Sequence, residues 1–186
     1  MAYQQVSIPR FYVDHMQLFK AVGVQVTYAP DGIIGINSSS IYSRDIPAGG
    51  SSLAYYNPAT GSYFPNIPMN FCAILGHNYS GQYVDIGYHD TGAHNNCVIT
   101  GVVNGGSAVN TSTGYFTPSY NGFSILTFDE VDISTINHIF LYQGTGYNTG
   151  AWTSKIGSLL FGSYYDMKNA PNLSLTMSRD YGGTKE

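Results

Sequence analysis

The residues whose types could support chemistry gather between positions 77 and 97. His89 and Asp90 are followed closely by His94 and Cys97, and His77 precedes them. Imidazole and thiolate groups are common zinc ligands, but the spacing His-x4-His-x2-Cys matches none of the usual zinc patterns. A polar loop between two strands explains the same residues. We therefore predict no metal site and no cofactor.

Motifs for enzymatic catalysis are weak. Asp90-Thr91-Gly92 repeats the triplet of aspartic proteases, but the apolar flanks that hold that loop are missing, and the triplet is also ordinary turn chemistry. Asp129 and Glu130 are adjacent in a strand-like segment, where neighbouring side chains point to opposite faces rather than toward one substrate. The chain has no nucleophile elbow, phosphate loop or dinucleotide fingerprint. We predict that the protein is not an enzyme.

Aromatic side chains supply the remaining candidate site. Tyr147 and Trp152 flank one Gly-rich loop, and with His89 they are the best candidates for a sugar platform, since Tyr and Trp rings bind sugars by stacking. The alternative is that these rings pack in strands and protein interfaces, because Tyr combines apolar area with a hydroxyl group. We favour packing and keep sugar binding as the alternative.

Composition indicates the elements that must position these residues. Only 10% of the 186 residues are charged, against about 25% in typical proteins. The chain contains 22 Gly and 17 Tyr, so it is rich in turn and strand formers. Net charge is −4 and the seven basic residues are scattered, which argues against nucleic-acid binding. No apolar run approaches the ~20 residues of a membrane span and no signal-peptide pattern is present, so we expect no membrane partner.

The hydrophobic pattern predicts one helix and many strands. The helix is expected over residues 15–22, ends at Gly23, and carries Leu18, Phe19 and Val22 on one apolar face. Short apolar or alternating runs between Gly, Asn, Ser and Pro predict strands. They cover residues 24–28, 32–37, 52–56, 70–75, 82–88, 97–103, 122–128, 138–142, 156–162 and 172–178.

This spacing of strands without intervening helices predicts an all-β fold, an antiparallel β-sandwich of the jelly-roll type with one short N-terminal helix. We expect a single domain overall, in which residues 1–23 form an arm with the helix and residues 24–186 form the sandwich with a C-terminal tail. Cys72 and Cys97 lie in apolar strand-like runs, where a buried free thiol is the commoner state. A bridge between them remains the alternative.

Three stretches carry a resemblance to a known class of protein. They are residues 8–14, residues 71–78 and residues 157–175. Together they resemble structural proteins of tailed-bacteriophage virions, particularly those of marine phages. The middle stretch also resembles the Ile-Leu-Gly-His-Asn strand and turn of galactose-binding-like, discoidin-type jelly rolls.

The resemblance implies a virion component, assembled in the host cytoplasm, that acts by protein–protein contact as a capsid decoration or tail-associated protein. Its expected partners are other virion proteins and copies of itself, with a cell-surface glycan as the partner in the alternative adhesin interpretation. Both termini are polar and weakly patterned, so we expect residues 1–10 and 179–186 to contact other subunits. The interface candidates are Tyr3, Arg10, Tyr115, Tyr120 and Arg179.

Overall fold

The structure of the protein is a computed structural model. It describes residues 9–26, 41–56, 64–65, 67–90, 97–98, 101–104, 115–131, 136–144 and 150–168. The chain divides into two units, Tyr12–Tyr164 and a smaller unit that joins Met1–Phe11 with Tyr165–Glu186. Among the described residues, no helix is long and apolar enough to cross a lipid bilayer.

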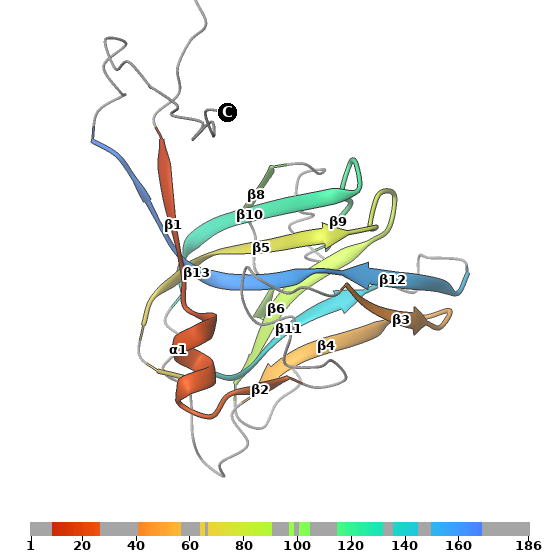
Figure 1. Cartoon of the computed structure of the whole chain (residues 1–186), viewed down its shortest axis with the longest axis horizontal. Helices are drawn as coiled ribbons and strands as arrows, with labels where there is room; N and C mark the ends of the chain where they lie inside the picture. The colour runs from red at the N-terminus through yellow and green to blue at the C-terminus, as the bar shows by residue number, and fades with distance from the viewer. Residues whose placement is uncertain are drawn as a thin grey trace, which may run out of the picture. The chain divides into compact units, whose positions relative to one another are not determined.

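The described residues form two sheets and a short two-stranded extension (Figure 1). The first sheet has the order β1 (Arg10–Asp14), β13 (Ser158–Asp166), β5 (Met69–His77), β10 (Gly122–Val131) and β8 (Gly101–Asn104). The second has the order β2 (Gln25–Val26), β4 (Ser51–Tyr56), β11 (Ile136–Gln143), β6 (Val84–Asp90) and β7 (Cys97–Val98), and β9 (Tyr115–Phe116) also pairs with β6. The extension pairs β12 (Trp152–Ile156) with β3 (Tyr42–Ile46).

The strand order is that of a jelly roll. Eight strands define this order along the chain, namely β1, β4, β5, β6, β9, β10, β11 and β13, whereas β2, β3, β7, β8 and β12 are additional to it. Numbered from one to eight in this list, the strands of the first sheet are 1, 8, 3 and 6 (β1, β13, β5 and β10). The strands of the second sheet are 2, 7, 4 and 5 (β4, β11, β6 and β9). This interleaving is the double Greek key of jelly rolls. With antiparallel ladders, and with α1 (Met16–Ala21) as the helix of the described residues, the predicted all-β antiparallel sandwich with one short N-terminal helix is confirmed.

The main core lies between the two sheets, because alternate side chains of each strand point inward. Cys72 and Ile74 of β5 are fully buried there with residues of β4, β6 and β11. The two layers also meet directly: the Tyr55 hydroxyl on β4 donates to the carbonyl oxygen of Leu159 on β13 at 3.2 Å. The Tyr55 ring meets the Phe161 ring edge-on at 5.8 Å. Apolar packing and this buried hydrogen bond therefore join the sheets.

The helix buries a different face from the predicted one. Met16 and Phe19, three residues apart, are fully buried in the core. Leu18 and Val22, which the pattern placed on the apolar face with Phe19, are 44% and 49% exposed. The prediction was wrong on these two residues because apolar spacing alone cannot tell which of two overlapping stripes faces the sheets.

One strand prediction is wrong because the chain passes from the second sheet to the first within the predicted strand. The single strand expected over residues 97–103 is two strands, since β7 pairs with β6 in the second sheet and β8 pairs with β10 in the first. Strands β3 and β12 were not predicted. The strands expected over residues 32–37 and 172–178 lie outside the described residues.

Gly162 on β13 makes the first testable prediction. A Cβ atom at this position would overlap the carbonyl oxygen of Val13 and lie 3.0 Å from the Phe71 ring. We expect Gly162→Ala to lower the free energy of unfolding by about 1–3 kcal/mol, because a backbone oxygen cannot move aside as a flexible side chain can. Gly150→Ala is the control, since a Cβ there has no neighbour within 4 Å. Equal unfolding free energies for the two variants in chemical denaturation would contradict this packing.

Cys72 makes the second prediction. Its thiol is free and fully buried in the core, and burial raises its pKa well above the ordinary value. The side chain of Cys97 lies outside the described residues, so the bridge is tested at Cys72. We expect Cys72 in native protein to resist alkylation and to react fully in denaturant, because the thiolate is the reactive species. Peptide mapping by mass spectrometry measures this, and rapid labelling of native protein would be the contrary result.

Candidate assembly surface

The outer edge of β1 is exposed and apolar. The exposed fractions of Phe11, Tyr12 and Val13 are 59%, 41% and 46%, although they are consecutive residues of a sheet strand. In the first sheet β1 has β13 as its only neighbour, so its other edge is open within the described residues. Native proteins usually protect such edges with charge, Pro or a covering segment. Charged residues stand only at the two ends of β1, and the apolar edge between them marks a place where another strand can pair.

Two backbone hydrogen bonds fix the register of β1 against β13. The amide of His15 donates to the Phe161 carbonyl at 2.9 Å, and the amide of Met167 donates to the Pro9 carbonyl at 3.0 Å. The two positions are six residues apart on both strands, in opposite directions, so the ladder is antiparallel and has no net bulge. Alternate residues of an antiparallel strand bond to the same neighbour. The odd-numbered residues of β1 therefore face β13.

The even-numbered residues of β1 direct their backbone N–H and C=O groups toward the open edge. These residues are Arg10, Tyr12 and Asp14, and their side chains share one face of the strand. The Arg10 guanidinium forms an ion pair with Asp166, with Nε and Oδ1 2.6 Å apart. The Asp14 carboxylate accepts the amide of Met16 at 2.9 Å, at the start of α1. The strand thus carries a positive group near one end and a carboxylate at the other.

A second apolar cluster, the outer cluster, lies on the face of the first sheet away from the main core. It contains the buried residues Phe71, Ala73 and Leu160, with Leu75, Ile125 and Tyr164 packed against them. Leu160, Ala73 and Ile125 are cross-strand neighbours on β13, β5 and β10. The Tyr12 ring meets the Phe71 ring edge-on at 5.0 Å, so apolar surface continues from the outer cluster to the β1 edge.

The outer face of the second sheet holds a buried carboxyl group. Val84 and Ile86 on either side of Asp85 point into the core, so Asp85 points outward, where its cross-strand neighbours are Tyr142 and Tyr115. Only 5% of Asp85 is exposed, and its Oδ1 atom lacks a hydrogen-bond partner in the described part of the chain. Burial raises the pKa of this carboxyl group from 3.8 to about 6.

A histidine and a serine meet at the end of the sandwich where β5 ends. The amide of Tyr79 donates to His77 Nδ1 at 3.1 Å, so the neutral ring carries its proton on Nε2 and donates it to Ser124 Oγ, also at 3.1 Å. Burial lowers the pKa of His77 and a hydrogen bond to the Phe123 backbone opposes this more weakly. A nucleophilic serine must instead donate to an unprotonated ring nitrogen. This pair therefore has the polarity of a structural hydrogen bond.

Trp152 is half-buried and lies next to Tyr79, whose amide bonds to His77. Its ring meets Tyr79 edge-on at 5.4 Å and packs against the main core, while its Nε1 atom has no partner among the described residues. Gln143 donates to Ser154 Oγ at 3.0 Å and to the Tyr79 hydroxyl. His89 is known only as a backbone position in β6, and Tyr147 lies outside the described residues. The sugar platform of Tyr147, Trp152 and His89 stays a prediction, because Trp152 is the one of its three side chains that lies within the described residues.

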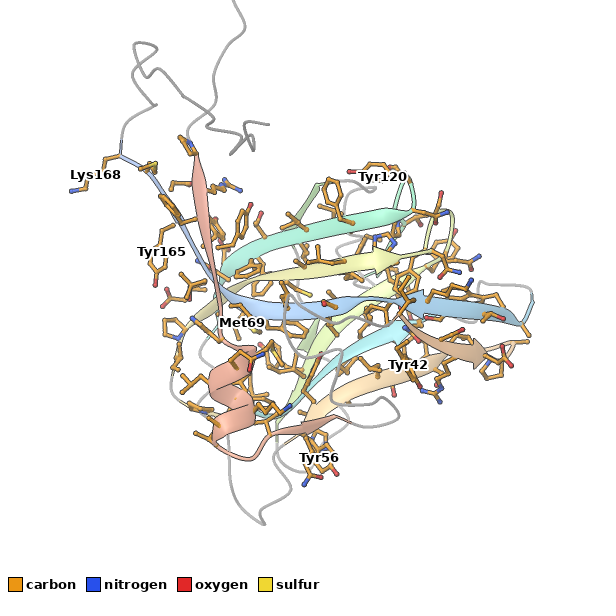
Figure 2. All side chains as sticks on the ribbon, in the orientation of Figure 1. Tyr42, Tyr56, Met69, Tyr120, Tyr165 and Lys168 are labelled. Carbon is orange, nitrogen blue, oxygen red and sulfur yellow. The ribbon has the colours of Figure 1, made fainter. Side chains whose placement is uncertain are left out.

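The interface candidates fall in different places. Tyr120 is 40% exposed, meets Phe123 edge-on at 5.4 Å, and stands on the outside of the turn into β10 (Figure 2). Tyr115 is half-buried beside Asp85, and Arg10 lies on the β1 edge. Tyr3 and Arg179 are outside the described residues.

The sequence interpretation missed the β1 edge and Asp85. Nothing in the run of Phe, Tyr and Val between Arg10 and Asp14 distinguishes an edge strand from a central one. Asp85 sits in an alternating run that predicts a solvated outer face, and its burial depends on distant residues.

Among the described residues, no group of three His, Cys, Asp or Glu side chains could hold a metal ion. Comparisons with protein-family models, with curated proteins and with solved structures find no match to this chain.

Asp85 makes the third prediction. The folded state holds the Asp85 proton more tightly than the unfolded state, so its charge costs stability as the pH rises from about 4 to about 6. We expect Asp85→Asn to raise the free energy of unfolding at pH 8 by roughly 2–3 kcal/mol and to leave it nearly unchanged at pH 4. Chemical denaturation at both pH values measures this. The exposed Asp129→Asn is the control, and an equal gain for Asp85→Asn at both pH values would contradict the assignment.

Proposed function

We propose that the protein is a structural component of a bacteriophage virion that acts by protein–protein assembly, as a capsid decoration or tail-associated protein. The observation that carries this proposal is the exposed β1 edge, with Phe11, Tyr12 and Val13 in a row. Exposed apolar surface of this kind marks interaction sites.

Two further features support assembly. The low charge content suits a surface that copies of the chain cover, because interface cores are depleted in Lys, Glu and Asp and enriched in Tyr and Phe. The jelly roll is a fold that viral capsid domains use, although it is shared with lectins and cupins and supports the proposal only by analogy. The partners proposed are other virion proteins and copies of the chain itself, in particles assembled in the host cytoplasm.

A carbohydrate-binding module on the virion surface is the second candidate. The row of Tyr142, Asp85 and Tyr115 favours it, since a carboxylate between aromatic residues can accept sugar hydroxyl groups. Asp85 is almost completely buried, however, whereas the β1 edge is exposed. Assembly is therefore the better supported function.

The fourth prediction concerns particles. In purified phage particles that encode this chain, we expect mass spectrometry to find it at a fixed copy number per particle. Replacing both Phe11 and Val13 with Ser is expected to reduce that copy number at least tenfold, because it removes the apolar surface of the β1 edge.

The control is Leu18→Ser, which removes a side chain of similar exposure from α1 and is expected to leave incorporation unchanged. Absence of wild-type chain from particles would overturn the proposal. Binding on a glycan array that is lost in Asp85→Asn would support the second candidate instead, because that variant removes the carboxylate between Tyr142 and Tyr115.

A further inference from the structure

We infer that β1 pairs antiparallel with β1 of a second copy of this chain, across a two-fold axis at Tyr12. The inference rests on the proposed assembly function and adds its first partner and register. Such pairing is strand addition at an open sheet edge. It would join the five-stranded first sheets of two copies into one continuous sheet.

The direction of the backbone hydrogen-bonding groups of β1 suits this pairing. Arg10, Tyr12 and Asp14 direct their N–H and C=O groups toward the open edge, because the odd-numbered residues bond to β13. Placing Tyr12 opposite its own counterpart puts Arg10 opposite the partner copy's Asp14, and Asp14 opposite the partner copy's Arg10. All three pairs then exchange backbone hydrogen bonds. A shift by one residue would place the backbone groups of an even-numbered residue opposite an odd-numbered residue of the partner copy, whose groups point toward its own β13. The hydrogen bonds between the two strands would then be lost.

The charges of β1 favour the antiparallel, self-complementary arrangement. Arg10 and Asp14 stand at opposite ends of the same face of the strand, so a two-fold axis between copies sets opposite charges across the interface twice. Parallel pairing in register would place Arg10 beside Arg10 and Asp14 beside Asp14. Like charges directly opposite each other destabilise a sheet.

The same register covers the exposed apolar residues. It places Phe11 opposite the partner copy's Val13 on one face, and these side chains are 59% and 46% exposed in the single chain. On the other face it brings two Tyr12 rings together, so the outer clusters of both copies become neighbours. A five-residue strand buries less area than a standard interface, and we therefore expect a dissociation constant in the micromolar range or above.

Cysteine cross-linking tests the register. Residues at the two-fold axis have Cα atoms about 5.5 Å apart in a hydrogen-bonded pair, which a disulfide can span. We expect Tyr12→Cys to form disulfide-linked dimers under mild oxidation, seen on a non-reducing gel. Tyr120→Cys is the matched control, because Tyr120 is as exposed as Tyr12 but lies away from β1. Wild-type chain gives the background from the natural cysteines.

A pair of charge variants provides a second measurement that needs no new cysteine. Arg10→Glu sets acidic groups opposite each other and is expected to weaken dimerisation at least tenfold in sedimentation equilibrium. Asp166→Asn breaks the same intrachain ion pair but leaves Arg10 and Asp14 in place, so it is expected to keep wild-type dimerisation.

The outcomes separate the register from the proposed function. Self-association of the wild-type chain, without cross-linking of Tyr12→Cys above Tyr120→Cys, would overturn the register and leave assembly standing. Equal dimerisation of Arg10→Glu and Asp166→Asn would also overturn it. A chain that is missing from particles would overturn the proposed function, whatever the gel shows.

Discussion

The rest of the structure depends on β5 and β13 being apolar on both faces. Their side chains alternate between the main core and the outer cluster, as Cys72 and Ala73 do on β5 and Phe161 and Leu160 do on β13. A strand buried on both sides cannot carry charge on either. The central strands of the first sheet therefore account for part of the low charge content of the chain, and interface composition need not explain all of it.

Sequence patterns predicted more of the fold than of the candidate site. Gly- and Asn-rich breaks between short apolar runs predicted an antiparallel sandwich, because alternation and turn chemistry are local properties. The change of sheet between β7 and β8 is not local, since it depends on which neighbour each strand finds. The face of α1 was missed for a similar reason: Met16 is buried and Leu18 is exposed because of where the sheets lie.

Candidate sites were harder to predict because burial depends on distant residues. Trp152 was a candidate for a sugar platform by residue type, and the sequence did not show that its half-buried ring meets Tyr79 edge-on. Asp85 lies in an alternating pattern that is typical of a solvated strand face, but its side chain is buried. The exposed residues of β1 carry ordinary apolar side chains, and they are notable only because no other described strand pairs with that edge of β1.

The antiparallel placement of Tyr12 and Tyr164 has a mechanical consequence. The chain enters the larger unit at Tyr12 and leaves it at Tyr164, and these two rings are 6.2 Å apart. A force that pulls the two segments away from each other would load the hydrogen bonds between β1 and β13 one after another, as in unzipping. A force that pulls both segments in the same direction along the strands leaves these hydrogen bonds almost unloaded, because neither strand is drawn away from the other. The ladder between β1 and β13 is therefore weak against separation of the two segments and insensitive to tension that both segments share.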